Sequence, residues 1–194
     1  MLIKLQDSDV PQVARLHCQE LNGLLSELGI EFLEKFYRCS LMIPEMWTIV
    51  EKRNDHILGF TSCVTNINGL NKKIIFKDLW GFIILFLKIF ITQPKLLVKT
   101  VKTFTYPGFS HDSPELLTMA VEKKHQGKGI GRNLFGKCLE EFRKRGIKSF
   151  RISAYDRLPA NGFYKHIGCG LENSFNFLGE KMNYYLYKIE DKNV

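Results

Sequence analysis

The sequence contains no Cys-x-x-Cys pair and no other closely spaced cysteines. Its five cysteines are scattered along the chain: Cys18, Cys39, Cys63, Cys138 and Cys169. Their odd number excludes a complete disulfide framework and predicts free thiols in a reducing compartment. The N-terminus has no apolar core of signal-peptide length, so we expect a cytoplasmic protein rather than a secreted one.

Long hydrophobic runs, internal repeats and low-complexity linkers are also missing. The apolar run Leu79–Thr92 is interrupted by Lys88 and is shorter than the roughly 20 residues that span a bilayer, which excludes a transmembrane helix there. Hydrophobic residues make up 45% and charged residues 25% of the chain, a balance typical of a globular protein. Because no linker divides the chain, we expect one continuous domain over residues 1–194.

Positive charge is in excess. The chain has 28 Lys and Arg against 20 Asp and Glu, a net charge of +8 that favours an anionic partner. A phosphorylated cofactor, a nucleic acid and a membrane surface all satisfy this condition, and charge alone does not choose among them. No nucleic-acid-binding motif is present, so a nucleic-acid partner is not expected.

Signals for helices and strands alternate along the chain. Apolar residues at helical spacing predict these helices: one after Asp9, one from about Glu27 to Leu41, one over 130–146 and a short one over 160–168. Runs of β-type residues predict strands at 2–6, 47–52, 57–65, 115–122 and 148–155. The tail is expected to form a hairpin over 171–190 that turns near Gly179 and Glu180.

The most informative stretch is HQGKGIGRNLF, where three glycines on alternate positions come just before a predicted helix. The first N–H groups of a helix have no intrahelical partner, and the helix dipole adds partial positive charge, so this end of a helix accepts phosphate oxygens. Glycines let that backbone approach a ligand closely. Lys123, Lys124, Lys128 and Arg132 add positive charge, and together these features predict a pyrophosphate-binding loop.

Spacing separates the nucleotide-binding loops that could occur here. A P-loop requires Ser or Thr after Gly-Lys, and a dinucleotide fold requires a third glycine where this chain has Leu134. The pattern from Gln126 to Gly131 is instead Q-x-x-G-x-G, which resembles the coenzyme A loop of the GNAT superfamily of acyl-CoA-dependent N-acyltransferases. The strand ELLTMAV and the segment Ala160–Gly168 are similar to the family's central strand and its A-x-x-F-Y-x-x-x-G-F segment, with Cys169 in place of the last aromatic residue.

The resemblance implies a fold and a set of site residues. The fold is α/β (α+β), a mixed, mostly antiparallel sheet with splayed central strands and flanking helices. The co-substrate is acetyl-CoA, without a metal. The residues implied to bind it are Met119, Ala120, Val121, Gln126, Gly127, Lys128, Gly129, Ile130, Gly131, Arg132 and Asn161. Asn161 stands a few residues after the family's usual asparagine, where this chain has Asp156 and Arg157.

Catalytic roles follow from the same resemblance. Tyr164 is implied to be the general acid that protonates the leaving thiolate, with Tyr155 as the substitute, and a backbone N–H of Met119 to Val121 is implied to bind the oxyanion. The sequence does not identify the general base. Glu115 is the preferred candidate, while His111, Asp112 and a water chain are alternatives.

The segment 79–104 is the unusual part of the sequence. Up to Thr92 it is apolar on nearly every face, and after Pro94 it alternates apolar residues with lysines as an interfacial helix does. We expect a helical insertion that packs over the acceptor cleft or in a homodimer interface. Contact with a membrane surface is the alternative, in which Lys88, Lys95, Lys99 and Lys102 attract anionic lipid.

The sequence therefore predicts an N-acetyltransferase that moves an acetyl group from acetyl-CoA to a primary amine of a small molecule by direct attack. An amino-sugar nucleotide is one candidate acceptor. Two alternatives stay open: a non-catalytic module of the same fold with a basic surface for a membrane or nucleic acid, and an N-acyltransferase for longer acyl chains.

Overall fold

A seven-stranded sheet lies at the centre of the molecule, in the order β1-β2-β3-β4-β5-β7-β6. We describe it from a computed structural model, in which residues 1–105, 113–177 and 179–190 are described, the side chains of residues 97, 102, 104 and 105 excepted. Only β4 and β5 pair in parallel, and the other described neighbours are antiparallel. The strands are β1 (Leu2–Lys4), β2 (Met46–Arg53), β3 (His56–Val64), β4 (Glu115–Val121), β5 (Ser149–Tyr155), β6 (Gly170–Phe177) and β7 (Glu180–Lys188). This mixed, mostly antiparallel sheet confirms the predicted fold class.

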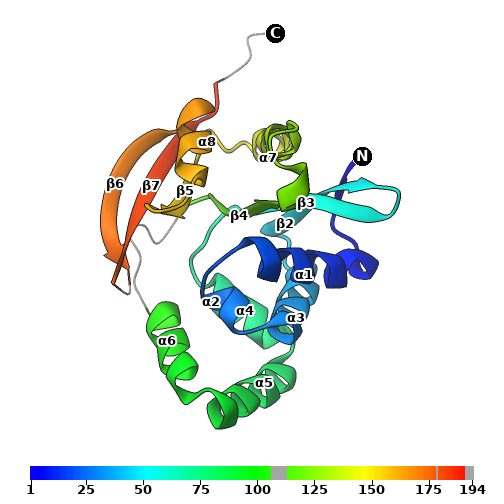
Figure 1. Ribbon diagram of the computed structural model, residues 1–194, viewed down its shortest axis with the longest axis vertical. Helices are drawn as coiled ribbons and strands as arrows, with labels where there is room; N and C mark the ends of the chain where they lie inside the picture. Colours follow the sequence, from blue (N-terminus) through cyan, green and yellow to red (C-terminus); the bar gives the residue numbers. More distant parts are fainter. Residues whose placement is uncertain (106–112, 178, 191–194) are drawn as a thin grey trace.

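Helices cover both faces of the sheet (Figure 1). One face carries α7 (Ile130–Lys144) and α8 (Ala160–His166). The other carries the remaining helices: α1 (Val10–Glu20), α2 (Leu24–Glu27), α3 (Ile30–Ser40), α4 (Leu70–Lys77), α5 (Leu79–Thr92) and α6 (Pro94–Thr105). Short 3₁₀ turns precede α1 at Asp7–Asp9 and α7 at Lys123–His125.

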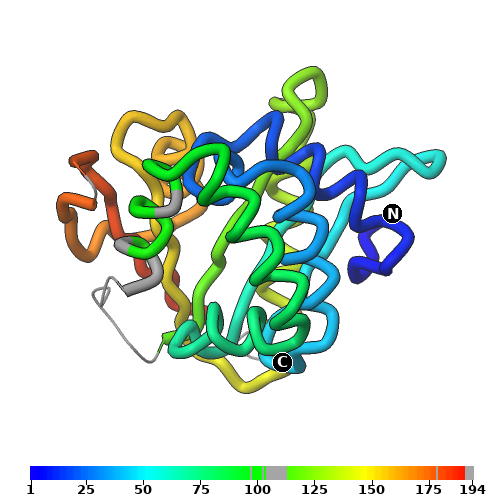
Figure 2. Tube along the Cα trace, turned by 90° about the horizontal axis from the view of Figure 1, so that it is seen from below, coloured from blue at the N-terminus to red at the C-terminus, as the bar shows by residue number. Residues whose placement is uncertain are grey.

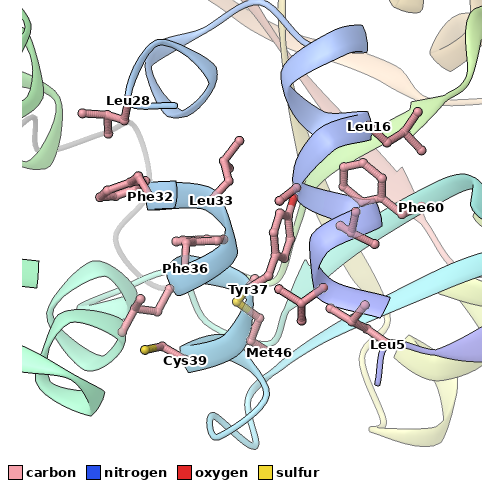
Figure 3. Packing of buried hydrophobic residues seen from close by; sticks show 14 of the residues in the cluster. Leu5, Leu16, Leu28, Phe32, Leu33, Phe36, Tyr37, Cys39, Met46 and Phe60 are labelled. Atoms are coloured by element: carbon pink, nitrogen blue, oxygen red, sulfur yellow. The ribbon is translucent and has the colours of Figure 1, made fainter. Parts of the chain in front are cut away.

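The larger of the two cores lies between the sheet and α1 to α5, and Figure 3 shows its centre. Tyr37 of α3 is fully buried there, packed edge-on against Phe60 of β3. Its hydroxyl lies 2.7 Å from Nδ1 of His17, a buried side chain of α1 whose pKa falls to about 4 because burial disfavours the charged ring. The neutral His17 and Tyr37 are therefore hydrogen-bonding partners inside the core.

Most predicted elements are present within a few residues of their expected bounds, and all five cysteines are free. The helix expected from Glu27 is the exception, because α2 ends there and α3 begins only at Ile30. Gly29 separates the two helices. Its φ of +89° is a left-handed conformation that glycine adopts without strain. The terminal hairpin turns at Gly179, where φ is +88°.

The predicted insertion comprises α5 and α6, and the sequence pattern did not anticipate α4 before them. The side chain of Asp78 accepts a hydrogen bond from the Gly81 N–H (3.0 Å) and caps α5. Figure 2, seen from below, shows these helices running across the underside of the molecule. No helix in the described parts of the chain combines the length and the apolar character needed to cross a membrane.

The start of α7 is seated against β3 at Gly59. A Cβ atom at this position would lie 2.9 Å from the Ala120 carbonyl oxygen, 3.0 Å from Cδ1 of Leu134 and 3.2 Å from Cγ2 of Ile130. Glycine is therefore required by close packing of the helix on the sheet, and this packing fixes where the N-terminus of α7 lies.

Gly59→Ala is expected to lower the free energy of unfolding by about 1–3 kcal/mol, because the added methyl group overpacks this contact. Gly136→Ala is the matched control, since a Cβ there meets nothing within 4 Å and alanine favours a helix interior by about 1 kcal/mol. Urea unfolding of both variants measures the difference. A Gly59→Ala protein as stable as the parent would contradict the tight packing.

Candidate active site

The site begins with a gap between two neighbouring strands. β4 and β5 pair only at Glu115 with Arg151 and at Leu116 with Ile152. Beyond these pairs β4 continues along β3 to Val121, while β5 continues along β7 to Tyr155. The two strands therefore part towards their C-terminal ends, which confirms the predicted splay. We call the space between residues 117–121 and 153–155 the wedge.

Two backbone N–H groups of β4 point into the wedge. The Glu122 N–H donates to the Leu58 carbonyl oxygen on β3 (2.8 Å), so alternation along the strand directs the amides of Val121 and Met119 away from β3. The Val121 carbonyl points the same way, since Nε2 of Gln126 donates to it (2.9 Å). The Ala120 amide points in the opposite direction and belongs to the hydrogen-bond ladder with β3. Of the three residues Met119 to Val121 that were predicted to bind the cofactor, two therefore direct an amide into the wedge.

The glycine-rich loop lies at the open end of the wedge. Gly127 and Gly129 have φ of +74° and +82°, and a Cβ on either would meet no atom within 4 Å, so backbone conformation alone selects glycine here. The backbone bond at the start of α7 runs from the Asn133 N–H to the Gly129 carbonyl (3.0 Å). In the described part of the chain no backbone carbonyl accepts from Ile130, Gly131 or Arg132, so these amides are open at the positive end of a 15-residue helix.

The residues of the predicted coenzyme A loop divide into two groups. Lys128 and Arg132 are exposed and supply positive charge, with Nη2 of Arg132 lying 3.2 Å from Nε2 of His166. The side chains of Gln126 and Ile130 make contacts within the protein, whereas the backbone amide of Ile130 is one of the open ones. The Gln126 side chain ties the loop to β4, and Ile130 is buried in the core beneath α7. Gly131 lies beside Phe163, whose Cε2 atom would be 3.6 Å from an added Cβ, an ordinary contact distance.

The side chain of Asn161, which the resemblance implied as a cofactor contact, is hydrogen-bonded within the protein. Its Nδ2 donates to the carbonyl oxygens of Tyr155 (2.8 Å), Asp156 (3.1 Å) and Leu158 (2.7 Å). Its Oδ1 accepts from Asn183 Nδ2 (3.0 Å) and from the Tyr185 hydroxyl (2.9 Å). Both ends of the amide are occupied by the protein, so direct binding of a cofactor does not fit this geometry. Asn161 instead fixes the turn that follows β5.

Tyr164 lies on the α7 and α8 face of the sheet. It is buried among Cys63 of β3, Cys138 of α7 and Cys169, with the Tyr185 ring of β7 at 5.9 Å between centroids. Cys63 pairs with Leu116 and Tyr185 pairs with Ile152, so Tyr164 lies over the last paired residues of β4 and β5, next to the point where the wedge begins. Burial raises the pKa of the phenol well above its ordinary value, which keeps the hydroxyl protonated. Tyr155, the predicted substitute, is at the end of β5 and its pKa is also raised by burial.

Glu115 lies on the opposite face. Leu116, Phe150 and Ile152 pack into the α7 and α8 core, so the strand alternation turns Glu115 and Arg151 towards α1 to α6. The Tyr184 hydroxyl donates to Oε1 of Glu115 (2.5 Å), and the Ser113 hydroxyl lies 3.3 Å from the same oxygen. Burial raises the pKa of this carboxyl group above its ordinary value. A carboxylate with a raised pKa is suited to accept a proton. His111 and Asp112, the alternative bases, lie outside the described residues.

Two features of the site were missed by sequence reasoning. Ser62 pairs with Thr118 while Cys63 pairs with Leu116, so Leu117 forms a β-bulge at the point where the wedge opens. Tyr184, the partner of Glu115, comes from the terminal hairpin. The run NYYLYK indicates a strand with aromatic residues on both faces, but nothing in it identifies the partner strand. No group of three or more potential His, Cys, Asp or Glu metal ligands occurs among the described residues.

The comparisons with known proteins agree with this architecture. The family model of the GNAT acetyltransferases matches residues 19–169. A GNAT-family protein from Desulfovibrio desulfuricans superposes with a TM-score of 0.66 at 13% identity, covering 98% of this chain and 99% of the other. The ribosomal-protein-S18-alanine N-acetyltransferase from Escherichia coli gives 0.62 at 12% identity, with 100% and 97% covered.

A third structure, YncA from Salmonella typhimurium with its cofactor acetyl-CoA, gives a TM-score of 0.62 at 11% identity and covers 100% of this chain and 96% of its own. No curated protein sequence matches the chain significantly. At these identities the structures support the fold alone, whereas the family model covers well over half of the chain. The protein belongs to the GNAT family of acetyltransferases.

Proposed function

We propose that the protein transfers the acetyl group of acetyl-CoA to a primary amine of a small molecule, with an amino-sugar nucleotide as one candidate acceptor. The observation that carries the proposal is the wedge between β4 and β5, which exposes the amides of Met119 and Val121 and leads to the glycine-rich loop. A non-catalytic binding module would need the loop but not the buried Tyr164 and Glu115 on the two faces of the sheet.

The residues of the loop fit a pyrophosphate group. The open amides of Ile130, Gly131 and Arg132 would donate to its oxygens, while Gly127 and Gly129 keep side chains away from it. Lys128 and Arg132 would balance its charge. Acetyl-CoA, when bound, supplies an activated acyl group as a thioester. The wedge would then receive the arm that carries the thioester, with the Met119 and Val121 amides as donors.

The side chains on the two faces of the sheet would divide the proton transfers. Glu115 would take a proton from the acceptor amine on the α1 to α6 face, aided by a raised pKa that brings the carboxylate closer to the pKa of an amine. Tyr164 would hold its proton on the α7 and α8 face and release it to the leaving thiolate. An N–H of Met119 or Val121 would stabilise negative charge on the carbonyl oxygen.

Acetyl-CoA is expected to raise the melting temperature, because a ligand at 100 times its Kd stabilises the native state by about 2.7 kcal/mol. For a chain of this size the shift is roughly 5–10 °C. Gly129→Val should abolish the shift, since a side chain at a left-handed position distorts the loop, whereas Gly136→Ala on the same helix should preserve it. Differential scanning fluorimetry measures the shift for each variant. No shift in the parent protein at millimolar acetyl-CoA would remove the main support for the proposal.

Tyr164→Phe is expected to lower kcat by roughly two to four orders of magnitude, the size of a general-acid contribution. The ring packing remains, so the thermal shift with acetyl-CoA should match that of the parent. Release of free thiol from acetyl-CoA with a panel of amines measures the rate. Tyr155→Phe is the matched control and should keep most of the activity. If the two variants behave in the opposite way, the donor is Tyr155 instead.

Glu115→Gln is expected to change the pH dependence of stability. The pKa of Glu115 is raised above 4.5 in the folded protein, so its contribution to stability is present below pH 4.5 and is lost as pH rises through the folded pKa. The melting temperature of Glu115→Gln minus that of the parent should therefore increase as pH rises from 4.5 and then level off. The variant should also lose turnover at neutral pH, when the base is needed.

Glu140→Gln provides the control for this pH series. Glu140 is paired with Lys137 (2.6 Å), which lowers its pKa, so any change in that variant should have the opposite sign and be small at an exposed site. Scanning fluorimetry between pH 4 and 8 covers both proteins. A difference for Glu115→Gln that is constant over this range would mean that the carboxylate titrates normally.

A further inference from the structure

Helix α5 carries a second apolar face that no described residue covers. Trp80, Ile84, Leu87 and Ile91 lie at helical spacing and have exposed fractions of 76%, 65%, 55% and 79%. We call these four residues the outer stripe. Exposed apolar patches of this kind on a single chain mark sites of interaction with a protein or a membrane.

The opposite face of α5 anchors the helix to the body of the molecule. Phe82, Leu85 and Ile89 are buried, and the Phe82 and Phe32 rings meet edge-on at 5.6 Å between centroids. The carboxylate of Asp78 caps α5 and forms an ion pair with Lys35 of α3. These contacts occupy only the inner face of α5. The outer stripe is therefore presented outward.

The segment that carries the outer stripe is rich in lysine. Residues 70–105 contain seven lysines and a single acidic residue, Asp78. Three of the lysines pair with acids of the main body, at distances of 2.5 to 2.6 Å: Lys73 with Glu45, Lys88 with Glu31 and Lys99 with Glu27. Within the described residues Lys72, Lys77 and Lys95 form no ion pair and remain as a positive fringe.

We propose that the outer stripe and its lysines bind the surface of an anionic phospholipid bilayer, with α5 lying along the plane of the membrane. The large apolar residues would enter the boundary between headgroups and acyl chains, and the lysines would meet the phosphates. A second copy of the chain is a poorer occupant, because a two-fold interface would bring the same positive segment against itself. Charge complementarity therefore selects the lipid surface.

The position of α5 permits this docking. In Figure 1 it is at the bottom of the molecule, on the far side from α7 and α8. A membrane bound there would leave the glycine-rich loop, at the start of α7, open to the solvent. The helix of 14 residues is about 21 Å long, enough to lie on a bilayer surface with all four residues of the outer stripe in contact.

The two tryptophans of the chain allow a direct test. Trp47 is buried, with 6% exposed, whereas Trp80 is 76% exposed. Vesicles of phosphatidylcholine with roughly 30% phosphatidylglycerol mimic an anionic membrane. They should shift the tryptophan emission of the full chain to shorter wavelength. Trp80→Phe should remove the shift while binding persists. Pure phosphatidylcholine vesicles should bind much more weakly.

Co-sedimentation with the same vesicles tests the two components of the surface. A triple variant with Trp80, Ile84 and Ile91 changed to Ser should bind about 100-fold more weakly, and so should a triple variant with Lys72, Lys77 and Lys95 changed to Gln. The charge-matched control changes Lys148, Lys165 and Lys188 to Gln, and Leu171→Ser, at a residue 53% exposed on β6, is the apolar control. Both controls should bind as the parent does.

Three results would overturn the proposal. The first is a parent protein that stays in the supernatant with anionic vesicles. The second is an equal loss of binding in the two lysine variants, which would mean that net charge alone drives the association. The third is a parent protein that does not bind vesicles and forms a dimer in sedimentation velocity, while the variant with Trp80, Ile84 and Ile91 changed is a monomer. A second copy of the chain would then cover the outer stripe. None of these readouts depends on acetyl transfer.

Discussion

The structure depends on where the lateral hydrogen bonding of the sheet stops. β4 and β5 share two residue pairs and then each strand follows another neighbour. Had the pairing continued, the amides of Met119 and Val121 would be used inside the sheet. Because β7 holds β5 along its whole length and the β-bulge at Leu117 bends β4, those amides remain available at the centre of the molecule.

The same parting of the strands separates two chemical environments. On one face Tyr164 sits among thiols and aromatic rings, where an ionised phenol is disfavoured. On the other, Glu115 is held by the Tyr184 hydroxyl in a mixed environment that includes Arg151, whose guanidinium lies 5.6 Å from the centre of the Tyr184 ring. A phenol that stays protonated and a carboxyl group with a raised pKa therefore lie on opposite faces of the same sheet.

Local chemistry explains which parts of this architecture could be predicted from the sequence. The glycine-rich loop was predictable because its requirements, positive φ and open amides before a helix, are met by adjacent residues. The role of Asn161 was not, because its partners Asn183 and Tyr185 come from β7, more than 20 residues away. Likewise, the direction of the Ala120 amide depends on the register between β3 and β4, which no pattern within β4 contains.

The insertion illustrates a different limit. Periodicity located α5, but its apolar residues occupy all faces, so the pattern did not distinguish the face that packs on α3 from the face that remains exposed. The break between α2 and α3 has a similar origin. Hydrophobic spacing continues across Gly29, and only the positive φ at that residue separates the two helices.

The short seam between β4 and β5 also has a mechanical consequence. The backbone connects the β1 to β4 half of the sheet to the β5, β7 and β6 half through those two residue pairs and the bond from the Arg151 N–H to the Pro114 carbonyl (2.9 Å). Side chains of both halves also share the core beneath α7 and α8. Separating the two halves would therefore break few backbone hydrogen bonds, and a molecule bound in the wedge would add contacts between them.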